Sequence, residues 1–212
     1  MINKKVENAL NKHLNSELYS AYLYMSMSAN FESANLKGFA NWMRVQIQEE
    51  MVHVRKFYDY ILQRGGKVVL TAIDSPPAGW VSPLKVFEDA LTHEQLVTNL
   101  INALVNLAFA EKDHATVNFL QWFVTEQVEE EASFNDVLQR LRIIGKDGGA
   151  LFMLDKEMAA RVFVPPATTA GQIDKRVLTP CSTRTRCFLQ IFFSLPLTNN
   201  WSIGGEQACA SL

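Results

Sequence analysis

Apolar residues recur every three or four positions along four stretches of this chain, a repeat that places side chains on one face of a helix. It predicts four amphipathic helices, over about residues 4–33, 36–64, 83–111 and 114–143. The four faces comprise Leu10, Leu14, Ala21, Tyr24, Ser28 and Phe31; Phe39, Met43, Gln46, Phe57 and Ile61; Leu84, Phe87, Leu91, Thr98, Ile101 and Val105; and Leu120, Phe123, Phe134, Val137 and Leu141. Near its midpoint each face also carries charged or amide residues, which are Glu17; Glu50 and His53; Glu94; and Gln127 and Glu130. Helices packed side by side would bring these groups to about the same height, so the pattern predicts a carboxylate cluster inside an all-α four-helix bundle.

Such a cluster requires a positive partner. Burying one unpaired carboxylate costs several kcal/mol, and grouping four of them adds repulsion between like charges. No Arg or Lys occupies the central positions of the four faces. A bound metal cation is the simplest counter-charge, with oxygen-rich ligands and a single imidazole.

The segments between the predicted helices set the topology. Residues 33–36 and 112–113 are so short that each must join an antiparallel hairpin. After Gly65-Gly66, the connector contains Asp74-Ser75-Pro76-Pro77-Ala78-Gly79, which cannot continue a helix. A helix of about 28 residues is roughly 42 Å long, whereas a connector of about 18 residues reaches about 60 Å. We therefore expect one long crossover, with the third helix parallel to the second, and a short fifth helix over residues 150–158.

Composition excludes several classes of function. The chain has 212 residues, of which 48% are hydrophobic, enough for a sizeable core. A net charge of −2 and a pI of about 6.1 provide no basic surface for nucleic acid. Lys4 and Lys5 are not followed by an apolar run, so no secretory signal is visible and we expect a cytoplasmic protein without a membrane partner.

Residues 161–212 differ in character from the predicted helical domain, residues 1–160. This tail contains Pro165-Pro166, a Thr-rich stretch and all three cysteines, Cys181, Cys187 and Cys209. The cysteines form no Cys-x-x-Cys pair of the kind that holds zinc or a rubredoxin-type iron, and the apolar run 188–197 is too short to span a bilayer. No periodic pattern docks the tail on the bundle, so we expect it to be poorly ordered or not native to the fold.

The tetrapeptide Glu50-Met51-Val52-His53 places a carboxylate and an imidazole on neighbouring positions of one helical face. Such tetrapeptides also arise by chance on solvated faces. This one lies on a predicted buried face, and three other helices supply matching acids. Of the four histidines, His13, His53, His93 and His114, only His53 is expected to share a face with carboxylates at metal-ligand spacing.

Two irons about 3.5 to 4 Å apart need a bridging carboxylate, and Glu50 is central enough to provide it. Glu17 and His53 would complete one iron, and Glu94 and Glu130 the other. Gln127 offers only a neutral amide oxygen, so we expect the second iron to be held less tightly.

Two further groups have competing interpretations. Glu49, Glu126 and Glu129 lie beside the predicted ligands, either as part of a solvated acidic face or as an outer iron site. Tyr24 lies two turns from Glu17 on the same face, either as an ordinary core tyrosine or as a group that hydrogen-bonds a ligand or supplies an electron.

Several stretches resemble the bacterial and archaeal non-haem ferritins over roughly residues 1–160. They are Asn15-Ser16-Glu17-Leu18-Tyr19-Ser20-Ala21-Tyr22-Leu23-Tyr24, Gln48-Glu49-Glu50-Met51-Val52-His53, His93-Glu94-Gln95, Phe119-Leu120-Gln121-Trp122-Phe123-Val124-Thr125-Glu126-Gln127-Val128-Glu129-Glu130-Glu131 and Leu151-Phe152-Met153-Leu154-Asp155-Lys156-Glu157. The resemblance implies a ferritin-like fold and a homo-oligomeric shell of 24 subunits. It also implies a ferroxidase that oxidises Fe(II) with O₂ or peroxide and stores ferric mineral.

The same resemblance implies a ligand set. Glu17, Glu50 and His53 would hold one iron; Glu50, Glu94 and Glu130 the second; and Glu49, Glu126 and Glu129 a third; Gln127 and Tyr24 also match family positions. Haem-containing bacterioferritins carry a second Glu-x-x-His, which would fall at residues 127–130, so its absence favours the haem-free branch. The sequence departs from the family pattern after about Arg161.

Three alternatives remain. A rubrerythrin-like peroxidase uses a related di-iron bundle but needs paired Cys-x-x-Cys motifs. A DNA-protecting mini-ferritin, which like the first would detoxify peroxide, usually needs a basic arm, for which Lys4 and Lys5 are a poor substitute. A purely structural bundle would have no reason to keep carboxylates where Leu or Ala would cost less.

Overall fold

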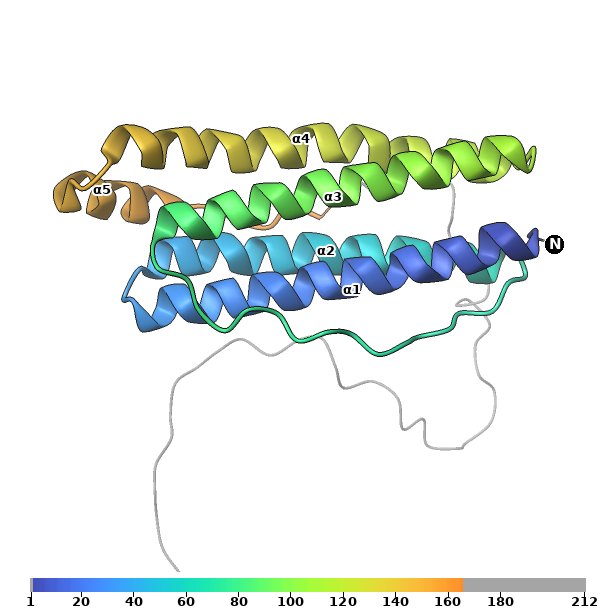
Figure 1. Ribbon diagram of the computed structural model, residues 1–212, viewed down its shortest axis with the longest axis horizontal. Helices are drawn as coiled ribbons and strands as arrows, with labels where there is room; N and C mark the ends of the chain where they lie inside the picture. The colour runs from blue at the N-terminus through green and yellow to red at the C-terminus, as the bar shows by residue number, and fades with distance from the viewer. Residues whose placement is uncertain (1, 166–212) are drawn as a thin grey trace, which may run out of the picture. The chain divides into compact units, whose positions relative to one another are not determined.

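The computed structural model describes residues 2–165, and in this range the secondary structure is entirely helical. The five helices are α1 (Lys4–Ser33), α2 (Lys37–Gln63), α3 (Pro83–Ala110), α4 (His114–Ile144) and α5 (Gly148–Met158) (Figure 1). Each predicted bound lies within two residues of the observed one. The all-α four-helix bundle with a short fifth helix is thus confirmed.

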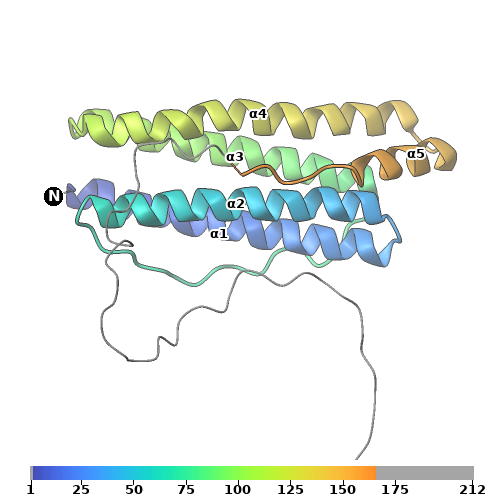
Figure 2. The ribbon, with the colours of Figure 1, turned by 180° about the vertical axis from the view of Figure 1, so that it is seen from behind.

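The chain forms two antiparallel hairpins, α1–α2 and α3–α4, joined by one long crossover. Figures 1 and 2 show the crossover running along the length of the bundle, so that α3 starts at the same end as α2 and lies parallel to it. The tight turns use left-handed backbone conformations at Asn35 (φ 58°) and Lys112 (φ 57°). Side chains of Asn3, Ser82 and Asp113 cap the N-termini of α1, α3 and α4 by accepting backbone N–H bonds.

Polar side chains of α1 hold the extended crossover in place. Asn11 accepts a hydrogen bond from Val69 N (2.7 Å), and its amide donates to the carbonyl of Lys67 (3.0 Å). Three more α1 side chains, Asn15, Ser26 and Asn30, bond crossover backbone groups further along. Because these bonds satisfy backbone groups that no strand or helix pairs, the crossover keeps a defined path without secondary structure.

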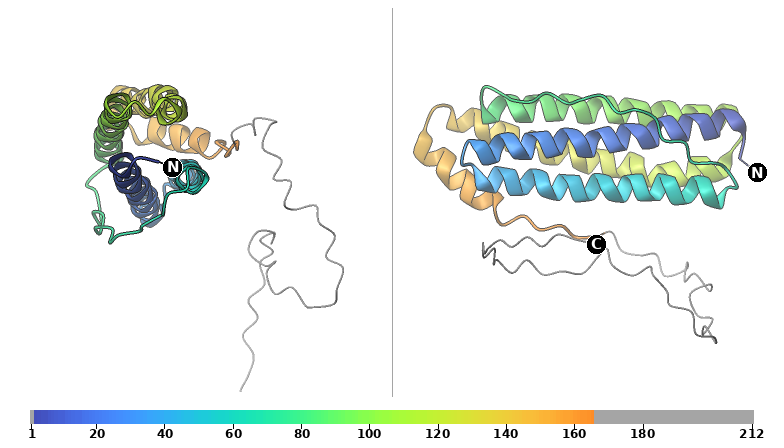
Figure 3. Two further views of the ribbon diagram at one scale, coloured as in Figure 1. Left: turned by 90° about the vertical axis from the view of Figure 1, so that its right-hand side faces the viewer. Right: turned by 90° about the horizontal axis from the view of Figure 1, so that it is seen from below.

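The bundle core consists of two apolar clusters, one on either side of the central polar layer. One cluster includes Phe31, Phe39, Phe87 and Phe134; the other includes Leu14, Phe57, Ile101 and Phe123. Figure 3 shows the helices end-on, packed around this interior.

The predicted inward faces of the first, second and fourth helices are buried in full, but the predicted face of α3 was wrong in part. Leu84, Leu91, Thr98 and Val105 are only half-buried. The core instead receives Val86, Ala90, Val97, Leu104 and Ala108 beside Phe87, Glu94 and Ile101. This helix carries apolar residues around most of its circumference, so periodicity alone does not select its inward face.

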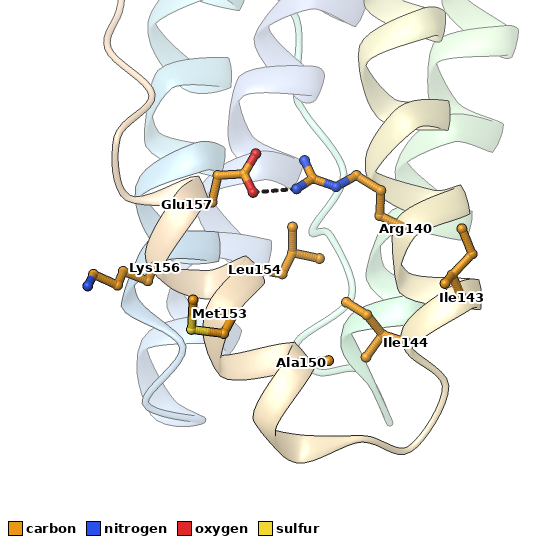
Figure 4. Close-up of a pocket in the computed structure, with 8 residues that line it drawn as sticks. All are labelled: Arg140, Ile143, Ile144, Ala150, Met153, Leu154, Lys156 and Glu157. Carbon is orange, nitrogen blue, oxygen red and sulfur yellow. Dashed lines mark hydrogen bonds and ion pairs between the residues drawn. The ribbon is translucent and has the colours of Figure 1, made fainter.

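Helix α5 packs across the start of α2 and the end of α4. Asp155 accepts a hydrogen bond from Phe39 N (2.9 Å), and the carbonyl of the same residue lies so close to Gly38 that a Cβ would clash with it. Leu154 and Met158 are buried beneath the helix. A cleft of about 740 Å³ remains between α4 and α5, where Arg140 and Glu157 form an ion pair (Figure 4).

Most of the predicted tail lies outside the described residues, including Cys181, Cys187, Cys209 and the apolar run 188–197. The expectation that residues 161–212 are foreign to the fold stays a prediction. Within residues 2–165, no helix is long and apolar enough to cross a membrane.

Candidate metal centre

The six central polar residues converge from α1, α2, α3 and α4, between the two apolar clusters. All are buried: Glu17 is 0% exposed, Glu50 2%, His53 3%, Glu94 1%, Gln127 3% and Glu130 5%. The predicted carboxylate cluster at one height of the bundle therefore exists.

Three side chains that could bind a metal ion, Glu17, Glu50 and His53, lie together between α1 and α2. His53 Nδ1 is 3.2 Å from Glu50 Oε2 and 3.8 Å from Glu17 Oε2. One ligand atom from each of these residues falls within 4.8 Å of the other two, a spacing that a single metal ion can bridge. Glu50 and His53 lie three residues apart, so one helical face presents both.

The central carboxylates of α3 and α4, Glu94 and Glu130, are held by hydrogen bonds. Gln127 Nε2 donates to Glu94 Oε2 (3.0 Å), and Tyr24 donates its hydroxyl proton to the other oxygen of Glu94. Glu130 Oε2 accepts from Gln46 Nε2 (2.8 Å). Tyr24 is thus a fully buried tyrosine that also bonds a central carboxylate, which combines the two interpretations of its role.

The carboxylate of Glu17 is the central group best suited to a metal cation. Neither of its carboxylate oxygens has a hydrogen-bond partner, although both are buried. The nearest side-chain nitrogen is His13 Nε2, which lies 2.7 Å from Glu17 Oε1 and can compensate the carboxylate only when its imidazole is protonated. Since an unsatisfied buried carboxylate is costly, the oxygens of Glu17 suit a metal ion well.

His13 corrects the expectation that only His53 shares a face with carboxylates. It lies four residues before Glu17 and is 3% exposed. That i, i+4 spacing was the signal in the sequence that could have identified it. Gln46, the partner of Glu130, was placed on the inward face of α2 but not assigned to the site.

Burial and mutual repulsion shift the acidities of the central groups. Burial raises the pKa of Glu50 well above its usual range and raises that of Glu94. Burial, helped by the charge of Glu94, raises the pKa of Glu130 to about 8. Burial also acts against ionisation of Glu17, but the neighbouring imidazoles of His13 and His53 together outweigh it, so the pKa of Glu17 falls well below its usual range.

For His53, burial alone would lower the pKa, yet its contacts with Glu17 and Glu50 raise it well above the usual value. Without metal, protons on the imidazole and the raised carboxyls therefore balance the buried charge. A metal cation binding here must displace those protons.

The outer acids behave differently from one another. Glu126, His53 and Glu130 also lie close together: one ligand atom from each falls within 4.8 Å of the other two, as in the group of Glu17, Glu50 and His53. Glu49 is half-buried and accepts a hydrogen bond from Arg161 Nη2 (2.7 Å). Glu129 is exposed and does not belong to either group of ligand atoms in the described chain.

Comparison with known proteins identifies the relationship. Residues 7–144 match the family model described as the ferritin-like domain. The chain belongs to the ferritin family. It is 45% identical over 161 residues to the bacterial non-heme ferritin of Bacteroides fragilis (strain 638R), covering 76% of this chain and 100% of that protein. The bacterial non-heme ferritin of Staphylococcus saprophyticus is likewise 45% identical, over 77% of this chain and 98% of the relative.

Solved structures agree with this family. An Archaeoglobus fulgidus ferritin engineered into a closed form superimposes on this ferritin with a TM-score of 0.77 at 54% identity, covering 77% of this chain and 100% of the other. The open-pore ferritin of the same archaeon gives a TM-score of 0.76 at 54% identity, covering 76% of this chain and 100% of the other. The alignments cover these relatives almost in full but only about three quarters of the present chain, so this ferritin has residues with no counterpart in them.

Proposed function

We propose that this ferritin stores iron, oxidising Fe(II) with O₂ or peroxide at its buried centre and depositing ferric mineral inside a homo-oligomeric shell. Iron is here the substrate and cargo. The observation that carries the proposal is the layer of four buried carboxylates and one imidazole in the bundle centre, in which the oxygens of Glu17 accept no hydrogen bond. The names of its relatives support the storage role.

In this proposal Glu17, Glu50 and His53 hold one Fe(II), and Glu50, Glu94 and Glu130 hold a second. Glu50 bridges the two. Anionic ligands stabilise Fe(III) more than Fe(II), so the cluster favours loss of an electron from each iron to the oxidant. Gln127 contributes a neutral amide only, which leaves the second iron more weakly bound.

Binding of the metal is coupled to the release of protons from the central side chains. Glu130 has a pKa of about 8 in the metal-free protein, and the pKa values of Glu50 and His53 are raised as well. Binding of Fe(II) releases these protons, so uptake is weaker in acid and strengthens as pH rises toward 8.

Tyr24 orients one ligand. Its hydroxyl donates to Glu94, which directs the other oxygen of that carboxylate toward Gln127 and the metal position. In this proposal Tyr24 also supplies an electron to the oxidant, a role supported by the full burial of its ring beside the centre.

Glu49, Glu126 and Glu129 form an outer iron position in this proposal. The position of Glu126 beside His53 and Glu130 supports it, whereas the exposure of Glu129 makes that ligand the weakest of the three. Iron at the outer position would be in transit between the buried pair and the mineral.

The test is to add Fe(II) in air to the metal-free full chain, following ferric formation by absorbance and sizing the iron-bearing species by chromatography. Fast oxidation of many irons per subunit, eluting in a large particle, is expected. Oxidation that stops at two or three irons in a small species would refute storage but retain the ferroxidase. Absence of fast oxidation would refute both.

A further inference from the structure

One arginine from the segment after α5 contacts Glu49, one of the three outer acids. Arg161 Nη2 lies 2.7 Å from Glu49 Oε2, and its guanidinium carbon lies 4.2 Å from the centroid of the Trp42 ring. The side chains of Arg161 and Glu49 are 24% and 23% exposed, so the pair is mostly shielded from water. Figure 2 shows the segment that carries Arg161 returning from α5 along α2.

The fold holds this guanidinium in place. Asn41 Nδ2 donates to the carbonyl oxygens of Arg161 (2.9 Å) and Ala159 (3.3 Å), which fixes the backbone on either side. Asp155 caps Phe39 at the start of α2 and anchors α5 itself. These hydrogen bonds fix the backbone that carries Arg161, so its contact with Glu49 is better ordered than an ion pair between two flexible surface side chains.

The outer acids have a second cation nearby. On α2, Trp42, Glu49 and Lys56 are seven residues apart, which places them on one face at intervals of about two turns. Lys56 Nζ lies 3.9 Å from the centroid of the Trp122 ring, and its charge acts on Glu126. Arg161 and Lys56 thus each lie over a tryptophan ring. Such a cation–π contact can hold the side chain in place when the neighbouring carboxylate binds a metal ion instead.

We propose that Arg161 is a built-in competitor for the outer metal position: its guanidinium occupies the Glu49 carboxylate until a metal cation displaces it. This inference rests on the proposed function, because it concerns the outer position of that centre. A guanidinium and a metal ion cannot share Glu49 Oε2 without close repulsion. Displaced, the guanidinium remains over Trp42, ready to return when the metal leaves. Arg161 is therefore a positioning residue that keeps outer iron exchangeable.

The experiment uses the metal-free full chain without oxygen and Zn²⁺ as a redox-silent probe, titrated by calorimetry. Arg161→Gln is expected to bind outer Zn²⁺ about tenfold more tightly, while the inner affinities stay unchanged. Arg161→Lys keeps the charge but loses the planar fork, so a smaller gain of about two- to threefold is expected. Arg140→Gln, which breaks the α4–α5 ion pair with Glu157, is the matched control and should bind as wild type.

Outer binding that is unchanged or weaker in Arg161→Gln would overturn the inference, since the arginine would then merely support Glu49. Circular dichroism and inner-site binding report whether that variant folds. Should it fail to fold, Arg161→Lys decides by the same criterion. Zn²⁺ binding involves no oxidation, so the two proposals fail separately: slow Fe(II) oxidation in wild type refutes the ferroxidase alone, and unaltered outer Zn²⁺ affinity refutes the competitor alone.

Discussion

Replacing Glu50 by Gln tests the centre with the least disturbance of the fold. Glu50 is 2% exposed, and burial favours its neutral, protonated form. A glutamine has nearly the shape of that neutral acid, so the free energy of unfolding of the metal-free protein should change by no more than about 1 kcal/mol. Glu50→Ala also removes the buried acid but leaves a cavity, whose cost offsets part or all of the relief.

Iron oxidation should respond very differently. Gln cannot bridge two cations as a carboxylate does, and disturbance of even a supporting group commonly costs 10- to 100-fold in metal affinity or activity. We therefore expect the initial rate of ferric formation in Glu50→Gln to fall by at least about 100-fold while the thermal midpoint stays near wild type. Glu32→Gln, in a half-exposed ion pair with Arg44, is the control and should oxidise iron normally.

The assay mixes metal-free protein with about two Fe(II) ions per subunit in air and follows ferric absorbance, with circular dichroism on the same samples. Wild-type oxidation by Glu50→Gln would refute the bridging assignment. Loss of helical signal in that variant would refute the view that the carboxylate serves metal binding at the expense of stability.

Three further predictions concern other parts of the molecule. The pKa of Glu130 in the folded protein is about 8, above its ordinary value of 4.5, so between these values the folded state retains a proton that the unfolded chain releases. This one group should therefore lower the free energy of unfolding of the metal-free protein by up to about 1.4 kcal/mol per pH unit as the pH rises from about 5 to 8. Chemical denaturation across that range should show a flatter profile for Glu130→Gln, and parallel profiles would contradict the assignment. Gln127→Glu adds a carboxylate beside Glu94, so calorimetry should find the second Zn²⁺ bound about tenfold more tightly and the metal-free protein less stable; unchanged affinity would remove Gln127 from the ligand set. Gly38→Ala should cost about 1–3 kcal/mol of unfolding free energy and expose α5 to proteolysis, whereas Gly148→Ala, whose Cβ meets no atom within 4 Å, should not; equal effects would refute the packing argument.

Helix positions and most inward faces could be predicted because local rules determine them. Proline, glycine and short polar turns mark the ends of the helices, and periodicity identifies the faces of α1, α2 and α4. The face of α3 could not be read in the same way: Val97 and Leu104 are buried where Thr98 and Val105 were expected. On a helix that is apolar around most of its circumference, tertiary packing selects the inward side.

The central polar residues were predictable because a carboxylate on an apolar face conflicts with its surroundings. The contact of Arg161 with Glu49 was not, since it joins residues 112 positions apart and depends on how α5 docks on α2. No periodic pattern reports such docking. His13 is different, because its spacing of four residues from Glu17 on one helix is a local signal that the sequence does contain.

The polar layer between the two apolar clusters also bears on how this sequence can change over generations. Most substitutions of a buried carboxylate by an apolar residue would relieve repulsion and desolvation, so drift toward greater stability would erase the layer one residue at a time. A lineage that ceased to need iron would be expected to lose Glu17 or Glu94 early, while the surrounding phenylalanines persisted. The buried acids of all four helices are thus residues that stability alone would not favour.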